Sequence, residues 1–262
     1  MTPAPEPRPD LLRVEAVCKR FGGLSALEDV SLAVREGEIY GLIGPNGAGK
    51  TTLFNCMTGL YDLTQGRILF QGADLARRKP HEIVALGFAR TFQNIRLFAN
   101  MTALENVMVG RHPRSRAGVL GAVLRGPRTR TEERDIRDRA KALMQFVGLT
   151  RRGDTLASHL SYGDQRRLEI ARALATEPRL LALDEPVAGM NPSERRQMSE
   201  LFLRLRDTGI TLLLIEHDVK LVMGLCDRVA VLDHGRRIAE GTPVEVRRDP
   251  AVVEAYLGVE AA

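Results

Sequence analysis

The sequence is poor in aromatic residues and contains no long apolar run. Only 5% of its 262 residues are Phe, Tyr or Trp, and Trp does not occur. The longest apolar segments, such as ITLLLI and LLAL, have the length of a β-strand, whereas a membrane-spanning helix needs about 20 apolar residues. The start, MTPAPEPRPD, has no apolar segment behind a basic one, so no signal peptide is predicted, and its prolines predict a disordered tail over residues 1–10. We therefore expect a soluble globular protein.

Cysteine is also scarce. Cys18, Cys56 and Cys226 are an odd number of thiols without the spacing of a metal site, and the five histidines show no zinc pattern. This usage is typical of a reducing compartment, where disulfides are rare. We expect all three cysteines to be buried structural thiols.

The chain has a net charge of +5 and a pI of about 9.4, which raises the question of a nucleic-acid partner. In RTEERDIRDRAK, however, basic and acidic residues are interleaved, as on a solvated helix face. The sequence also has no cluster of aromatic and basic residues on which bases could stack. We therefore expect no nucleic-acid partner, and note that an excess of Arg also suits a protein at the cytoplasmic face of a membrane complex.

Strand-like and helix-like segments alternate along the chain. The segments LLRVEAVCKRF and LEDVSLAVREGEIYGLIG are predicted strands, and a helix is predicted from Lys50 to about Gly59. Residues 94–157 are mainly helical in pattern, with an exposed loop and a short helix expected in the Gly-, Pro- and Arg-rich part around 111–131. Three buried strands follow, in RLLALDE, GITLLLIEH and RVAVLDHG. The alternation predicts an α/β fold with a parallel sheet covered on both faces.

The segment GPNGAGKT fits the phosphate-loop pattern at every required position and lies between an apolar strand and a helix. Its glycines let backbone N–H groups curl around phosphate oxygens, and the helix N-terminus faces the anion. Lys50 adds a positive charge for the terminal phosphates, and the Thr51 hydroxyl is a ligand for Mg²⁺. The predicted phosphate-binding residues are Gly44, Pro45, Asn46, Gly47, Ala48, Gly49, Lys50, Thr51 and Thr52.

Charged residues follow two later strands. LLALDE places Asp184 and Glu185 at the end of one strand, and His217 follows another in LLLIEH. Ligands of open α/β sheets bind outside the carboxyl ends of the strands, so we expect these side chains beside the phosphate loop. Asp184 is predicted to hold Mg²⁺, either as a direct ligand or by contacting one of the ligands of the ion. Glu185 is predicted to orient or deprotonate water, and His217 to contact the γ-phosphate.

Further motifs identify the class of nucleotide-binding protein. No NKxD segment for guanine occurs and no second basic lid pattern, which argues against a GTPase and a small-molecule kinase. From about Leu11 to Gly258, the chain resembles ATP-binding subunits of ABC transporters. Segment by segment, GPNGAGKTT is similar to their Walker A motif, LLALDEP to Walker B, LSYGDQ to the signature motif, FQN to the Q-loop, EHD to the switch-histidine motif and NPSE to the D-loop.

The resemblance implies roles for further residues. Phe21 in KRFGG matches the aromatic residue that stacks on adenine, and Gln93 matches the Q-loop glutamine, a ligand of Mg²⁺ with a part in hydrolysis. Ser161, Gly163 and Asp164 of the signature are expected to contact ATP. The family implies that this ATP is held by another subunit. The predicted helix from Gln165 to Ala175 then presents its N-terminal amides to that γ-phosphate.

The signature departs from the family pattern at one position. Tyr162 replaces the first of two adjacent glycines, so Gly163 alone remains. Because Tyr is strained at positive φ, we expect an ordinary backbone conformation at this position. This variant, with RRLEIARAL after it, is similar to the ATPases of branched-chain amino-acid importers, as is the ending AEGTPVEVRRDPAVVEAYLG.

The resemblance also implies an architecture. A P-loop NTPase (RecA-like) ABC ATPase core is expected to carry a small antiparallel β region and an inserted α-helical subdomain. After the tail, residues 11–93 are predicted to form a β region with the first half of the core, and residues 94–160 a helical subdomain that ends at the signature. Residues 161–240 are predicted to form the second half of the core, and residues 241–262 a C-terminal helical segment.

The implied partners are transmembrane permease subunits, a second ATPase subunit (a paralogue or another copy) and, indirectly, a periplasmic or extracellular solute-binding protein. ATP and Mg²⁺ are the implied cofactors, and the implied location is the cytoplasmic face of the cell membrane. A urea importer, a lipid or lipopolysaccharide exporter and a soluble ABC-type switch remain alternatives, because none of the residues singled out contacts the cargo.

Overall fold

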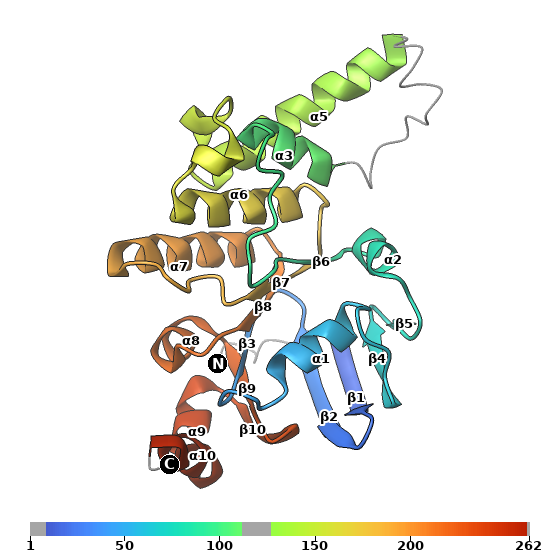
Figure 1. Ribbon diagram of the computed structural model, residues 1–262, viewed down its shortest axis with the longest axis vertical. Helices are drawn as coiled ribbons and strands as arrows, with labels where there is room; N and C mark the ends of the chain where they lie inside the picture. The colour runs from blue at the N-terminus through green and yellow to red at the C-terminus, as the bar shows by residue number, and fades with distance from the viewer. Residues whose placement is uncertain (1–8, 112–126, 261–262) are drawn as a thin grey trace, which may run out of the picture.

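The computed structural model describes residues 9–111 and 127–260, which form two β-sheets with helices around them (Figure 1). The smaller sheet is antiparallel, with the strand order β2-β1-β4-β5. Its strands are β1 (Asp10–Phe21), β2 (Leu24–Arg35), β4 (Gln65–Phe70) and β5 (Ala73–Asp74). The antiparallel region expected in the N-terminal third is therefore confirmed.

Two sequence predictions about this region need correction. Residues 1–8 of the predicted tail lie outside the described residues, but Asp10 is already part of β1, because it pairs with Arg35 of β2. Cys56 and Cys226 are buried free thiols as expected, whereas Cys18 is only partly buried. The Cys18 sulfur instead accepts a hydrogen bond from the Asp29 N–H at 3.3 Å on the partly solvated sheet.

The larger sheet has the strand order β10-β9-β3-β8-β7-β6 and is parallel except for the edge strand β10, as expected for an α/β core. Its strands are β3 (Ile39–Ile43), β6 (Phe88–Arg90), β7 (Leu180–Asp184), β8 (Thr211–Ile215), β9 (Arg228–Asp233) and β10 (Arg236–Gly241). Every residue of β3, β7 and β8 is buried, which explains why these strands read as continuous apolar runs.

The two faces of the larger sheet belong to two separate cores. Because successive strand residues point to opposite faces, Leu180 and Ala182 enter one core, and Leu181 and Leu183 enter the other. The first core is completed by α1 and the smaller sheet, and the second by the remaining long helices. The helices are α1 (Lys50–Met57), α2 (Pro80–Ala85), α3 (Ala103–Gly110), α5 (Pro127–Phe146), α6 (Tyr162–Leu174), α7 (Pro192–Asp207), α8 (Val219–Leu225), α9 (Pro243–Arg248) and α10 (Pro250–Glu260).

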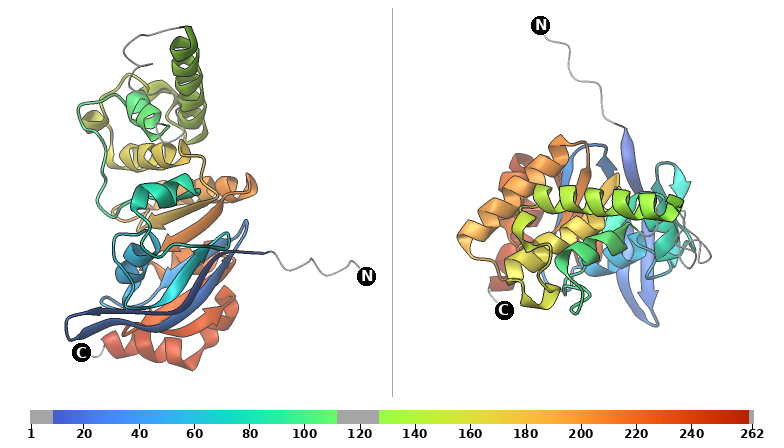
Figure 2. Two further views of the ribbon diagram at one scale, coloured as in Figure 1. Left: turned by 90° about the vertical axis from the view of Figure 1, so that its right-hand side faces the viewer. Right: turned by 90° about the horizontal axis from the view of Figure 1, so that it is seen from above.

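Helices α3, α5 and α6 pack together in a layer at one end of the molecule, and α9 and α10 lie at the other end (Figures 1 and 2). Most of the segment predicted as loop and short helix, residues 112–126, lies outside the described residues. Helix α6 begins at Tyr162 instead of Gln165, because the Ser161 side chain caps it by accepting a hydrogen bond from the Asp164 N–H at 3.2 Å.

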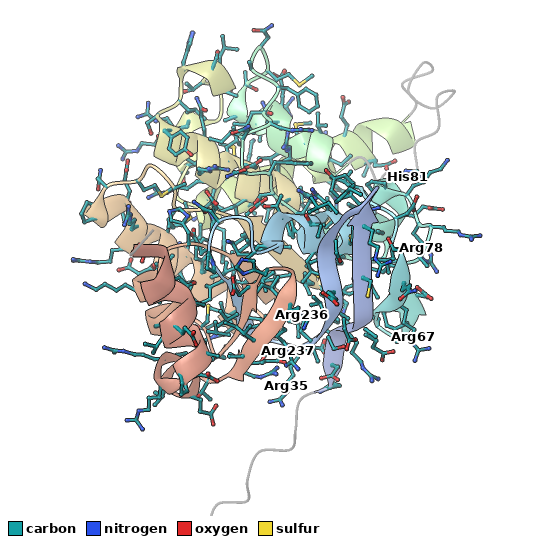
Figure 3. The ribbon with its side chains drawn as sticks, turned by 60° about the horizontal axis from the view of Figure 1, so that its bottom comes forward. Arg35, Arg67, Arg78, His81, Arg236 and Arg237 are labelled. Atoms are coloured by element: carbon teal, nitrogen blue, oxygen red, sulfur yellow. The ribbon has the colours of Figure 1, made fainter. Side chains whose placement is uncertain are left out.

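The arginines of the sheets are largely matched by acidic neighbours. Figure 3 labels Arg67 on β4 and Arg236 on β10, and these pair with Glu15 and Glu28 of the smaller sheet at 2.5 and 2.8 Å. Such pairing is typical of a solvated surface. Among the described residues, no helix is both long and apolar enough to cross a membrane.

Candidate nucleotide site

The phosphate loop connects the end of β3 to the start of α1 and requires glycine at two positions. Gly49 has a φ of 98°, in the left-handed region, and a Cβ there would lie 2.8 Å from the carbonyl oxygen of Ala26. At Gly44 a Cβ would lie 2.1 Å from the carbonyl oxygen of Leu232. Since the loop is packed between β2 and β9, only glycine fits at these two positions.

Lys50 lies in the centre of this loop. Its Nζ donates hydrogen bonds to the carbonyl oxygens of Gly44 at 2.6 Å and Pro45 at 2.8 Å, and the residue is only 9% exposed. Burial lowers the pKa of the ammonium group, while the carboxylates of Glu185 and Asp184 raise it. The loop therefore has a buried positive charge at the N-terminus of α1, a position suited to an anion.

An open cleft of 590 Å³ lies against the loop. Its lining includes the predicted residues Phe21, Gln93 and Glu185 together with residues 46–52. The phosphate loop, Gln93 and Glu185 thus line one cleft. The cleft lies at the carboxyl edge of the parallel sheet, where ligands of open α/β sheets bind. A cleft of this size admits a nucleotide.

The acidic pair at the end of β7 has two different environments. Asp184 is 3% exposed, and burial raises the pKa of its carboxyl group to about 6, against the lowering effect of Arg90. Glu185 follows in the left-handed region with a φ of 46°, and its N–H donates to the carbonyl oxygen of Ile215 at 2.8 Å. A non-glycine residue held in this region costs about 1–3 kcal/mol, so β8 holds Glu185 in a strained position facing the cleft.

His217 lies beside Glu185 but is not among the residues that line the cleft. Its Nδ1 is 3.7 Å from the Glu185 Oε1 atom and 3.9 Å from an oxygen of the buried Glu216. The side chain is 58% exposed. The structure therefore places the histidine at the predicted strand end, next to the acidic residue and accessible to a partner.

The residues present fit Mg²⁺ that arrives with a nucleotide. Among the described residues, no group of three or more His, Cys, Asp and Glu side chains could hold a metal alone. Mg²⁺ is usually held by one or two carboxylates together with phosphates and water, through oxygen ligands. Thr51, Gln93 and Asp184 offer a hydroxyl, an amide oxygen and a carboxylate around the phosphate loop, which is a suitable donor set.

Comparisons with known proteins agree with this geometry. A family model described as ABC transporter matches residues 27–188. The chain belongs to the ABC transporter ATPase family. A second model, described as branched-chain amino acid ATP-binding cassette transporter, matches residues 236–262.

Relatives of this ABC ATPase match over almost their whole length. The high-affinity branched-chain amino acid transport ATP-binding protein LivG of Salmonella typhimurium is 48% identical and BraF of Pseudomonas aeruginosa 45% identical, each covering 95% of this chain and 98% of the relative. The crystal structure of an ABC transporter cassette in its ADP conformation has a TM-score of 0.83 at 35% identity, covering 95% of this chain and 99% of that one. These findings confirm the family, the fold and the ATPase class predicted from the motifs.

The signature motif of this ABC ATPase lies outside its own cleft. Ser161 caps α6 and Asp164 lies in its first turn, and no residue of 160–165 is among the described residues that line the cleft. Tyr162 does not have a positive φ, so the predicted ordinary conformation is confirmed. Ser161 and Tyr162, at the start of α6, are exposed and lie outside the lining of this cleft.

Phe21 is 43% exposed at the mouth of the cleft, with its ring edge-to-face against Tyr61 at a centroid distance of 5.3 Å. Lys19 places its Nζ 4.8 Å from the Phe21 ring centre. One ring face is thus supported by protein contacts, an arrangement that fits a platform for a base.

Further residues beside the phosphate loop were not found from the sequence, among them Leu24, Ser25 and Ala26 of β2, which line the cleft. His234 and Gly235, which follow β9, line the cleft beside the phosphate loop. Tyr256 of α10 lies near Gly44. Burial raises the pKa of the Tyr256 phenol to about 12, and the backbone of Gly44 acts in the opposite direction. No local pattern marks these residues, although HG after a buried strand is a turn signal that could have drawn attention to the first pair.

We expect Lys50→Ala to weaken ATP binding by about 10- to 100-fold, because a hydrogen bond to a charged group contributes roughly 1.5–3 kcal/mol. The measurement is a calorimetric ATP titration of the purified chain. Lys141→Ala, an exposed lysine on α5, is the matched control and should bind ATP like the wild type. Wild-type affinity in Lys50→Ala would contradict the site.

Phe21→Ala should weaken ATP binding by about 5- to 100-fold, since stacking of a base on an aromatic ring contributes roughly 1–3 kcal/mol. Phe21→Tyr keeps the ring and should retain affinity. Inorganic tripolyphosphate, which has no base, should bind both variants as it binds the wild type. An equal loss for tripolyphosphate would show that Phe21 acts on the loop and not on adenine.

Proposed function

We propose that this chain is the ATP-hydrolysing subunit of a branched-chain amino-acid importer and works as a peripheral subunit at the cytoplasmic face of the cell membrane. The observation that carries the proposal is the match of residues 236–262 to the branched-chain amino acid cassette model. Its described residues, 236–260, include β10, α9 and α10, at the opposite end of the molecule from α5 (Figure 1). None of the nucleotide motifs falls within residues 236–262, so this likeness is separate from the motifs shared by ABC ATPases in general.

In the proposed arrangement, two ATPase subunits enclose two ATP molecules. Each ATP is bound by the phosphate loop of one subunit and by Ser161, Gly163 and Asp164 of the other. The position of the signature outside its own cleft supports this arrangement, as does the likeness to a dimeric cassette bound to ADP and Pi, with a TM-score of 0.75 at 25% identity over 88% of this chain and 98% of that one. The second subunit is a paralogue or another copy.

The proposed roles in hydrolysis follow from the geometry of the site. Lys50 and the loop amides bind the phosphates, and Glu185 accepts the proton of the attacking water from its strained position. His217, beside Glu185, contacts the γ-phosphate. Thr51, Gln93 and Asp184 would hold Mg²⁺, which supplies charge neutralisation for the phosphate oxygens.

A groove of 340 Å³ fits the expected contact with the permease. It lies between α2, the segment after β6 and helices α3 and α6, and it includes Phe98 and Val109, which are 47% and 37% exposed. Exposed apolar side chains beside a groove are typical of a protein contact. A solute-binding protein would then contact the permease and not this chain.

An uptake assay tests the cargo. Cells that lack this chain should lose uptake of radiolabelled leucine, and the wild-type gene should restore it whereas Glu185→Gln should not. Urea uptake and lipopolysaccharide export are measured in the same cells. Loss of either of these with normal leucine uptake would reassign the cargo, and loss of none would favour a soluble ABC-type switch.

A further inference from the structure

One face of α6 carries three charged residues at helical spacing, Arg166, Glu169 and Arg172, here called the α6 stripe. Arg166 and Glu169 are 3% and 2% exposed and form an ion pair, with NH1 and Oε2 at 3.1 Å. Burial raises the pKa of the Glu169 carboxyl group, and the Arg166 charge opposes this effect. The Arg166–Glu169 pair is therefore internal to the molecule, whereas Arg172 is partly exposed.

The α6 stripe holds the backbone of the segment that follows β6. Arg166 donates to the carbonyl oxygen of Phe92 at 2.7 Å and to that of Gln93. Glu169 accepts a hydrogen bond from the Phe92 N–H at 3.4 Å, and Arg172 donates to the carbonyl oxygen of Arg96. This segment has no regular secondary structure, so the stripe supplies the partners that a sheet or helix would otherwise provide.

Tyr162 extends the stripe to the start of the helix. Its hydroxyl accepts hydrogen bonds from Arg166 Nε at 3.3 Å and NH2 at 3.1 Å. On its other side, the ring is near Gly189, where an added Cβ would lie 3.6 Å from it. The residue that departs from the family signature is thus part of the same network, one position after Ser161.

Three functional regions meet at the stripe. Gln93 lines the nucleotide cleft of this chain, Ser161 is proposed to contact ATP held by the partner subunit, and Glu169 and Arg172 line the proposed permease groove. A buried ion pair contributes little to stability relative to apolar residues of similar size. What the pair does is join the backbone of the Gln93 segment to the helix that begins after Ser161.

We propose that Arg166 and Glu169 are positioning residues that make the Gln93 segment and the Ser161 end of α6 move as one unit. ATP in the cleft of one subunit would then set the orientation of the signature that this subunit presents to the other ATP. The inference rests on the proposed two-subunit arrangement and adds the residues that couple its two sites. Tyr162 acts in this network by holding the Arg166 guanidinium.

The test compares three variants in the Glu185→Gln background. Arg166→Met/Glu169→Met removes both charges together, so neither is left buried alone. Arg167→Met is the matched control, because Arg167 is on the same helix but its guanidinium bonds to Gln197 of α7. Tyr162→Phe removes only one hydroxyl, so it provides the test if the double variant does not fold.

Hydrogen exchange is followed in dilute protein, with and without Mg·ATP. In the parent and in Arg167→Met, ATP should slow exchange both in residues 44–52 and in residues 160–168. In the double variant, ATP should still slow exchange in residues 44–52. In residues 160–168 the ATP-dependent slowing should be smaller by at least about fivefold, because coupling between two sites typically changes affinity by about 5- to 150-fold. Tyr162→Phe should show a smaller loss in the same direction.

A second measurement separates coupling from a merely structural role. ATP-induced dimerisation of the double variant should weaken by about 5- to 150-fold while ATP affinity of the monomer stays unchanged. Unaltered slowing in 160–168 together with unaltered dimerisation would overturn the inference. Absence of slowing in 44–52 of the parent would instead overturn the nucleotide site on which it rests.

Discussion

Glu185→Gln is expected to bind ATP normally and to lose hydrolysis by about 10²- to 10⁴-fold, the usual contribution of a general base. The amide has almost the same shape as the carboxylate but cannot accept the proton of water. Lys50 and the loop amides, which bind the phosphates, are unchanged. The measurements are steady-state phosphate release and an ATP titration of the same preparation.

Asp233→Asn is a suitable control, because Asp233 is an acidic residue at the end of β9, another strand of the same sheet, and has no proposed part in proton transfer. It should hydrolyse ATP at close to the wild-type rate. Glu185→Gln should also accumulate as an ATP-bound dimer, since ATP that is not hydrolysed keeps two subunits together. Undiminished phosphate release by Glu185→Gln would remove Glu185 from the mechanism.

When two inactive variants are mixed, ATP hydrolysis is expected to return at roughly a quarter of the nucleotide sites. Lys50→Ala damages the phosphate loop, and Ser161→Arg damages the signature. If each ATP is held by the loop of one subunit and the signature of the other, a mixed dimer has both lesions in one site and none in the other. Random pairing makes half of the dimers mixed, and half of their sites are intact.

The readout of this mixing experiment is ATP hydrolysis, with each variant alone as the control. Formation of mixed dimers is checked by pull-down with two different affinity tags. If the natural partner is a paralogous subunit, the two lesions are placed on the two different chains. Demonstrated mixed dimers that hydrolyse no more ATP than their components would show that both motifs serve the same ATP.

Local motifs were sufficient to predict the phosphate loop, the acidic strand end and the α/β class. Gly44 and Gly49 are fixed positions of the phosphate-loop pattern, and β7 and β8 are recognisable because both of their faces are buried. The start of α6 was predicted three residues too late. Tyr and Gly are weak helix formers, yet the cap formed by Ser161 places both of them in the first turn.

The sequence by itself determined which family the chain belongs to and predicted which residues bind nucleotide, because phosphate recognition depends on residues that are adjacent in the chain. Only the tertiary structure decided how those residues are connected to one another. Arg166 and Phe92 are separated by 74 positions, and no periodicity in either segment indicates that they meet. Their contact depends on how the helical layer packs on the sheet, and that packing is set by many weak apolar contacts distributed over the whole chain.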